Sequence, residues 1–228
     1  NAFYVALSLL LNLDASLFQI VALSLQVSLL AVLIAAVLGF PLGAAVALWR
    51  FPGRSVMIVV LNALMGLPPV VVGLLLFVLL SRSGPLGALN WLFTPWAMIS
   101  AQSLIALPLV IGLTMAAVRS VDPSLRTQLR GLGATRWQAM VTILAEAKLG
   151  VLAAIAAAYG RIVAEVGAVM LVGGNIEAKT RVLTTAIVLE TRKGAFAIAL
   201  ALGLVLLLFT FLANGALLRL GGWRVRSR

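Results

Sequence analysis

The sequence contains no cysteine and no histidine, and only 6 of its 228 residues are acidic. Without cysteine there is no disulfide framework, and without cysteine or histidine the usual zinc and haem sites and thiol or imidazole catalysis are excluded. Six acidic residues offer few carboxylate pairs for acid–base chemistry. The chain also has no Gly-x-x-x-x-Gly-Lys-Ser/Thr loop for the phosphates of ATP. We therefore expect a protein that is not an enzyme and binds no metal or cofactor itself.

Apolar residues dominate the composition. They make up 63% of the chain against 10% charged residues, and the mean hydropathy is +1.18. Soluble proteins carry about 45–50% apolar and about 25% charged residues, so a water-soluble domain and a disordered chain are both excluded. The net charge of +11 would suggest a nucleic-acid partner in a soluble protein. In so apolar a chain, arginines that flank membrane spans explain it better, and we expect no nucleic acid.

Four long charge-free runs and one interrupted apolar run predict an all-α membrane protein. Crossing about 30 Å of hydrocarbon takes about 20 helical residues. The predicted spans are 20–48, 56–80, 96–118, 143–170 and 196–218. Residues 1–19 are predicted to be an extracytoplasmic or interfacial segment, because the apolar stretch 3–13 is short for a crossing and lacks the basic start of a secretory signal. Residues 219–228 are predicted to form a basic tail.

The basic residues indicate the orientation of these spans. Positive residues concentrate in cytoplasmic loops. The larger set comprises Arg50, Arg54, Arg119, Arg126, Arg130, Arg136, Lys148, Arg219, Arg224, Arg226 and Arg228. The smaller set, on the other side, comprises Arg82, Lys179, Arg181, Arg192 and Lys193. We therefore expect an N-terminus outside and a C-terminus in the cytoplasm.

Several spans contain helix breakers. Gly39 and Gly43 form a helix-packing pattern that Pro41 interrupts, and Pro68 and Pro69 are adjacent within the second span. Proline removes a backbone hydrogen bond, which inside a membrane requires protein or a wet cavity to satisfy the freed carbonyl. Bent helices lining a transport path are one interpretation, and the ordinary frequency of glycine and proline in membrane helices is the other. The proline pair favours the first.

The loop 119–142 is predicted to be a cytoplasmic helix–glycine–helix elbow. Asp122 and Pro123 are typical of a helix start. Leu125, Leu129 and Leu132 follow at helical spacing and predict one apolar face. Such an elbow can dock in a groove on another protein, or it can rest on the anionic leaflet of the membrane.

This loop resembles the cytoplasmic coupling loop in permease subunits of binding-protein-dependent ABC importers. The family pattern is Glu-Ala-Ala, three residues, Gly, nine residues, Ile-x-Leu-Pro; Gly133 matches its glycine and Ile143 its isoleucine, whereas 127–129 and 145–146 depart from it. The stretches 65–73, 81–87 and 160–175 resemble the oxyanion branch, which comprises molybdate, tungstate and sulfate permeases. The stretch 180–194 is most similar to the tungstate members.

The resemblance covers residues 20–218 and implies a type I ABC transmembrane domain in a bacterial or archaeal plasma membrane. Its implied partners are two ATP-binding cassette subunits that carry ATP and Mg, an extracytoplasmic oxyanion-binding protein and the lipid bilayer. Because one such chain encloses a central path poorly, we expect a second copy of it around a two-fold axis. The resemblance implies ATP-driven import of tungstate, with molybdate next. Sulfate import and a gradient-driven secondary anion carrier are the alternatives.

Two groups of residues are candidates for function. The residues expected to couple the chain to the ATPase are Leu125, Leu129, Leu132, Gly133, Ala134, Trp137 and Ile143. The candidates for the translocation path or gate are Pro68, Pro69, Arg161, Glu165, Gly173, Gly174, Asn175, Thr184 and Thr185.

Arg161 and Glu165 are charged residues inside the fourth span, where each costs about 2.5–3.5 kcal/mol on insertion scales. Their spacing of four predicts an ion pair on one helix face. We expect this pair mainly to hold the bundle together, and the alternative is that Arg161 faces the path of a divalent oxyanion. The segment 178–194 resembles a short outer helix, in which Thr184 and Thr185 could face the anion or cap local backbone.

Overall fold

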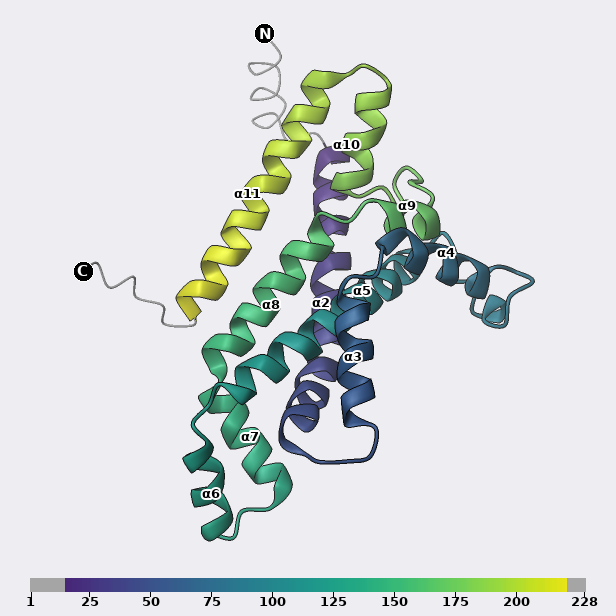
Figure 1. The fold of residues 1–228 in the computed structure, drawn as a ribbon. Helices are drawn as coiled ribbons and strands as arrows, with labels where there is room; N and C mark the ends of the chain where they lie inside the picture. Colours follow the sequence, from purple (N-terminus) through teal and green to yellow (C-terminus); the bar gives the residue numbers. More distant parts are fainter. Residues whose placement is uncertain (1–14, 221–228) are drawn as a thin grey trace.

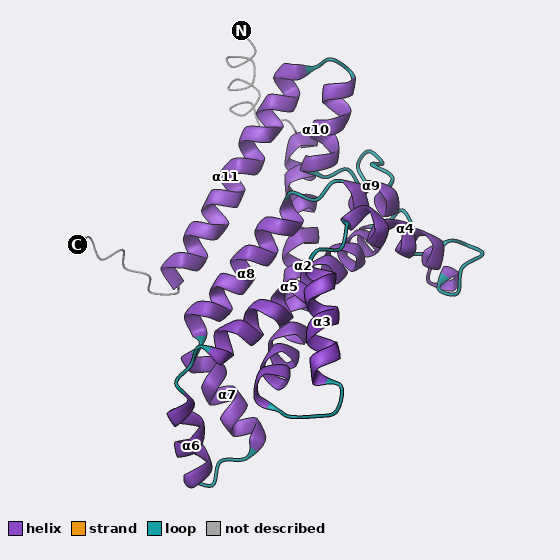
Figure 2. Ribbon diagram, viewed as in Figure 1, coloured by secondary structure: helices purple, strands orange, loops and turns teal. Residues whose placement is uncertain are grey.

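The computed structural model describes residues 15–220, which form ten α-helices and one short 3-10 turn (Figure 2). No strand occurs within this range, so the predicted all-α class is confirmed. The predicted N-terminal segment 1–19 and tail 219–228 lie mostly outside the described residues. The elements are α2 (Ala15–Leu48), α3 (Arg54–Met65), α4 (Pro69–Leu80), η1 (Gly87–Leu89), α5 (Pro95–Arg119), α6 (Pro123–Gly131), α7 (Arg136–Glu146), α8 (Lys148–Val163), α9 (Gly167–Gly173), α10 (Leu183–Arg192) and α11 (Phe196–Leu220).

Three of the predicted spans are single helices. The helices α2, α5 and α11 are long and apolar enough to cross a membrane, and they coincide with the predicted spans 20–48, 96–118 and 196–218. Of the most apolar window of α5, 67% is buried, against 33% for α2 and 17% for α11. The helix α5 is therefore the central element of the bundle.

The other two predicted spans are broken into shorter helices; a bend at the proline pair was expected, whereas the breaks within 143–170 were not. Span 56–80 divides into α3 and α4 with a bend of 99°, because Pro68 is extended and Pro69 opens a new helix. Span 143–170 divides into α7, α8 and α9, with a bend of 74° between α7 and α8 and a second break at 164–166. Counting each bent pair as one crossing gives the predicted five spans in the described part of the chain.

The helices run between two ends of the molecule (Figure 1). The helix α2 descends to the turn 49–53, α3 returns, and α6 and α7 protrude at the same lower end. The turn between α10 and α11 lies at the opposite end, and α4 with η1 extends to the side near α9. We call the lower end the elbow end and the other the α10 end.

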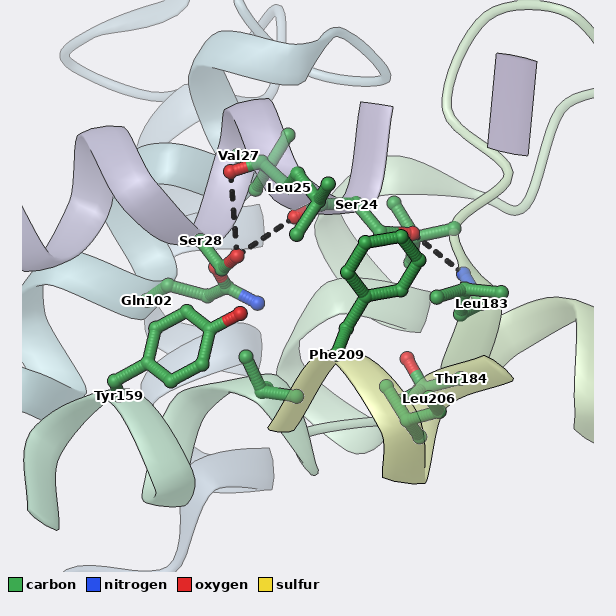
Figure 3. A pocket seen from close by; sticks show the side chains of 12 residues that line it. Ser24, Leu25, Val27, Ser28, Gln102, Tyr159, Leu183, Thr184, Leu206 and Phe209 are labelled. Atoms are coloured by element: carbon green, nitrogen blue, oxygen red, sulfur yellow. Dashed lines mark hydrogen bonds between the residues drawn. The ribbon is translucent and has the colours of Figure 1, made fainter. Parts of the chain in front are cut away.

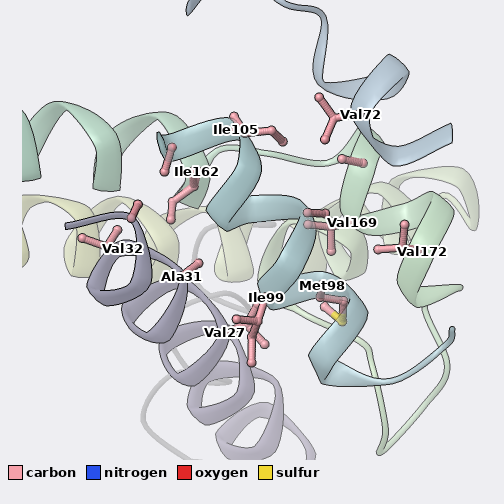
Figure 4. Close-up of a cluster of buried hydrophobic side chains, with 14 of the residues drawn as sticks. Val27, Ala31, Val32, Val72, Met98, Ile99, Ile105, Ile162, Val169 and Val172 are labelled. Carbon is pink, nitrogen blue, oxygen red and sulfur yellow. The ribbon is translucent and has the colours of Figure 1, made fainter. Parts of the chain in front are cut away.

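The core lies where α2, α4, α5, α8 and α9 meet (Figure 4). Glycines permit the closest approach between α2 and α5. A Cβ at Gly39 would come within 2.7 Å of Val110, and one at Gly43 within 2.6 Å of the Ile111 carbonyl. The pattern of small residues thus acts in helix packing, as predicted, and α2 remains one helix through Pro41.

Candidate coupling elbow and translocation path

The elbow formed by α6 and α7 is held by caps on both helices. The carboxylate of Asp122 accepts a hydrogen bond from the amide of Ser124 at 2.8 Å, and Pro123 occupies the first helical position. This bond lowers the pKa of Asp122 below its ordinary value of 3.8, so the cap is ionised at neutral pH. The helix start that the sequence predicts is confirmed.

The turn between the two helices is equally well defined. Gly133 has a φ of +77°, a conformation that favours glycine, and a Cβ there would meet no atom within 4 Å. The helix α7 then opens with a capping box: the hydroxyl of Thr135 accepts from the amide of Gln138 at 3.3 Å, and the Gln138 side chain accepts from the Thr135 amide at 2.8 Å. The elbow is therefore a projection in which both helices begin at residues with side-chain caps.

The predicted apolar face of the elbow divides into an inner and an outer part. Leu125 and Leu129 pack with the ends of α2 and α5, and Ile143 is only 2% exposed. By contrast, Leu132 is 83% exposed and Trp137 is 61% exposed. Ile143 thus cannot form part of a docking surface, and the two inner leucines support the elbow from beneath. The exposed tip, defined as 131–137, carries Leu132, Gly133 and Trp137, with Ala134 half-buried.

The predicted ion pair between Arg161 and Glu165 is wrong. Among the described residues the ion pairs are Arg181–Glu177 and Lys193–Glu190, and α8 ends before Glu165, so the helical spacing that would pair the two side chains is lost. Arg161 is exposed on α8. The carboxylate of Glu165, 9% exposed, accepts instead from the amide of Ala168 at 3.0 Å, in the first turn of α9.

The α10 end is cross-linked by buried hydroxyls. Thr184 donates to the carbonyl of Glu165 at 3.0 Å, and Thr185 accepts from the Val182 amide at 3.1 Å. Both predicted threonines therefore satisfy backbone groups. Thr180, which the sequence analysis missed, donates to the carbonyl of Gly173 at 2.6 Å and accepts from the amide of Ile176.

Gly173, Gly174 and Asn175, which were predicted as candidates for the path or gate, lie where α9 ends. Gly174 has a φ of +72° and Asn175 one of +51°. Gly173 packs on Met98, whose side chain a Cβ at residue 173 would approach to 3.0 Å. Just after the break at Pro68 and Pro69, Gly73 in α4 packs on Ala168 in α9. The helix α4 therefore rests on α9, the last part of the broken fourth span.

A small cavity with several polar side chains, which we call the polar cavity, lies between α2, α5, α8, α10 and α11 (Figure 3). Its polar lining comprises Ser24, Ser28, Gln102, Tyr159 and Thr184. The volume of about 20 Å³ is room for one water molecule.

The cavity also joins segments that are distant in sequence. Ser24 accepts from the amide of Leu183 at 2.7 Å, which fixes α10 against α2. Gln102 donates to the carbonyl of Ile162 at 3.2 Å, at the end of α8. Ser24 and Gln102 were not among the candidates predicted from the sequence, although polar side chains inside apolar spans were the available signal.

A solved structure of a known transporter has a similar arrangement of helices. A bacterial ABC transporter that imports the acidic polysaccharide alginate matches with a TM-score of 0.75 over 95% of this chain and 83% of that chain, at 22% identity. The chain therefore has the fold of a membrane-spanning ABC importer subunit. The family of binding-protein-dependent transport system inner membrane components matches residues 39–221, and the chain belongs to this family.

Curated relatives match most of the chain. A probable anion ABC transporter permease protein of Haloferax volcanii is 44% identical over 93% of this chain and 91% of its own length. The tungstate uptake system permease protein TupB of Peptoclostridium acidaminophilum is 39% identical over 95% of each chain. The molybdenum transport system permease protein ModB of Escherichia coli is 33% identical over 74% of this chain and 77% of its own length.

Proposed function

We propose that this chain is the permease subunit of an ATP-driven importer of tetrahedral divalent oxyanions, and that tungstate is its ion. The observation that carries the proposal is the full-length likeness to a tungstate uptake permease. Molybdate ranks second, because the likeness to a molybdenum permease is lower and covers less of the chain. Sulfate ranks behind both.

The exposed tip of the elbow supports docking to a separate ATPase. Leu132 and Trp137 are large apolar side chains that face outward on a capped turn, which suits insertion into a groove of a partner. The partner would bind ATP and Mg, since this chain has no phosphate-binding loop. Two copies of this chain would engage two ATPase subunits.

The translocation path would lie between two copies of the chain. The polar cavity inside the subunit holds about one water, so a tetrahedral oxyanion does not fit there in this conformation. Arg161, by contrast, is exposed on α8, and a charged side chain in contact with lipid tails is costly. A water-filled path on the two-fold axis would remove that cost and place one guanidinium from each copy beside the anion.

The distribution of basic residues supports one orientation of the subunit in the membrane. The elbow end carries basic residues of the larger set, among them Arg50, Arg54, Arg126, Arg130 and Arg136, and would face the cytoplasm. The α10 end would then receive the anion from an extracytoplasmic binding protein. Closure of the ATPases would move the elbows as rigid bodies and rock the helices between outward-open and inward-open states.

Reconstitution with the ATPase and the binding protein tests this function. Initial rates of uptake of tungstate, molybdate and sulfate should be measured in vesicles supplied with binding proteins of different specificity. Because the spans contain few charged groups with which to distinguish these ions, we expect the transported ion to follow the binding protein. Uptake of one ion whichever binding protein is supplied would contradict this assignment of selectivity.

A gradient-driven carrier is the alternative from another class. It should need further buried titratable groups, and Glu165 is the one acidic residue that is buried within residues 15–220. Uptake that continues without ATP and stops when ion gradients are collapsed would favour the carrier.

A further inference from the structure

The C-terminal end of α2 is held by two arginines. The last carbonyls of a helix have no partner within it and are satisfied from outside. Arg54, at the start of α3, donates from Nε to the carbonyl of Val46 at 2.7 Å and from Nη2 to that of Ala47 at 3.4 Å. The second arginine, Arg126, donates from Nη2 to the carbonyl of Leu48. Cations are also favoured at this end of a helix dipole.

Arg126 differs from Arg54 because it belongs to the elbow. It lies on α6 and reaches a carbonyl 78 residues earlier in the chain. Partial burial and then the nearby positive charges of Arg130 and Arg50 lower the pKa of Arg126. The surroundings thus disfavour the charged form of Arg126, while its guanidinium donates to the carbonyl of Leu48.

Apolar contacts surround this link. Leu125 and Leu129 of α6 pack in a cluster with Leu48 of α2, and Met140 of α7 is buried in the same cluster. The rings of Trp49 and Trp137 meet edge to face with centroids 5.7 Å apart. These contacts resist separation, whereas the bond from Arg126 has a defined direction and fixes α6 to one carbonyl of α2.

A displacement of the α2 terminus would reach the far end of the molecule. The helix α2 has 34 residues and is about 50 Å long at 1.5 Å per residue. Gly43 lies in tight contact with α5, so the two helices must shift together near the elbow. Towards the other end, Ser24 of α2 accepts the hydrogen bond from Leu183 that fixes α10.

We propose that Arg126 is the positioning residue that transmits the movement of the elbow to α2. This inference rests on the proposed function, in which the elbow docks on an ATPase. The hydrogen bond of Arg126 runs to α2, so this residue would join the docked element to the span that reaches the α10 end.

The test compares three variants in the complete transporter, using tungstate ions imported per ATP hydrolysed as the measurement. Arg126→Ala should still co-purify with the ATPase, but this ratio should fall roughly threefold or more. Arg126→Lys keeps a charged donor and should recover part of the loss. Arg54→Ala is the matched control, since it removes bonds to the same turn of α2 from outside the elbow. It should lower the melting temperature and leave the ratio unchanged.

A second measurement, the labelling rate of an introduced thiol, reports movement towards the α10 end. The chain has no cysteine, so Ser28→Cys places a unique thiol in the polar cavity. Its labelling rate should change on addition of ATP when Arg126 is present and should not respond to ATP in Arg126→Ala.

An unchanged import ratio and an ATP response retained in Arg126→Ala would overturn the inference while leaving the proposed function intact. An equal fall of the import ratio in Arg54→Ala would also overturn the inference. Loss of any cap on the C-terminal end of α2 would then explain the fall, without a specific role for Arg126. Absence of ATP-dependent import in the unaltered transporter would instead refute the proposed function, and the inference with it.

Discussion

The hydroxyl of Thr184 lies 3.0 Å from the main-chain carbonyl of Glu165, so α10 is tied to the break that ends α8. Thr184→Val keeps the shape and leaves this buried carbonyl without its partner, which should cost about 1 kcal/mol of stability. Thr142→Val is the control, because Thr142 is exposed and bonds only within α7. Thermal melting in detergent should show a lower midpoint for the first variant, and equal midpoints would contradict the tie.

Neutralising Arg161 and Glu165 should have additive effects. The two side chains do not form an ion pair, so the double variant Arg161→Gln, Glu165→Gln should lose the sum of the single losses within about 0.5 kcal/mol. Most of the loss should come from Glu165, which accepts a hydrogen bond from Ala168. A double-mutant cycle from melting data measures this. A double variant that is more stable than either single variant would contradict this prediction, because it would indicate that the two charges do form an ion pair.

A substitution at Gly133 should uncouple the elbow from the ATPase. Gly133→Asp forces a side chain into left-handed backbone, at about 1 kcal/mol, and places a charge at the exposed tip. Gly53→Asp is the matched control: Gly53 has a φ of +81°, has open space around it and lies at the same end, outside the elbow. We expect only the first variant to lose co-purification with the ATPase. Equal retention by both would remove Gly133 from the docking surface.

Arg161 should act in transport more than in stability. Its side chain is exposed and has no ion-pair partner within residues 15–220, so Arg161→Ala should leave the melting midpoint nearly unchanged. The initial rate of import should fall roughly tenfold, because a charge-assisted hydrogen bond to the anion is worth about 1.5–3 kcal/mol. Arg82→Ala, which removes an exposed arginine from the α4–α5 connection, should import normally. Normal import by Arg161→Ala would place Arg161 away from the path.

Features that depend on residues close together in the chain could be predicted from the sequence. Charge-free length determines α2, α5 and α11, and Asp122 with Pro123 determines the start of α6, because insertion and capping depend on neighbouring residues. The break at Pro68 and Pro69 was also indicated, although not its bend of 99°.

The remaining features depend on packing and could not be predicted. Neither glycine nor proline marks the break after Glu146, so 143–170 looked continuous. The inward orientation of Leu125 and Leu129 depends on where α2 and α5 end in space. The cavity around Gln102 joins residues of five helices, and no spacing along the chain indicates such a site.

The most direct test of the whole account is the dependence of import on ATP in vesicles whose ion gradients are collapsed by ionophores. We predict that tungstate accumulates inside only when the binding protein is present and ATP is supplied to the ATPase, and that accumulation parallels ATP hydrolysis. Tungstate uptake that proceeds at the same rate without ATP, or that stops when the ion gradients are collapsed, would contradict this prediction. It would show that import is not driven by an ATPase docked on the elbow.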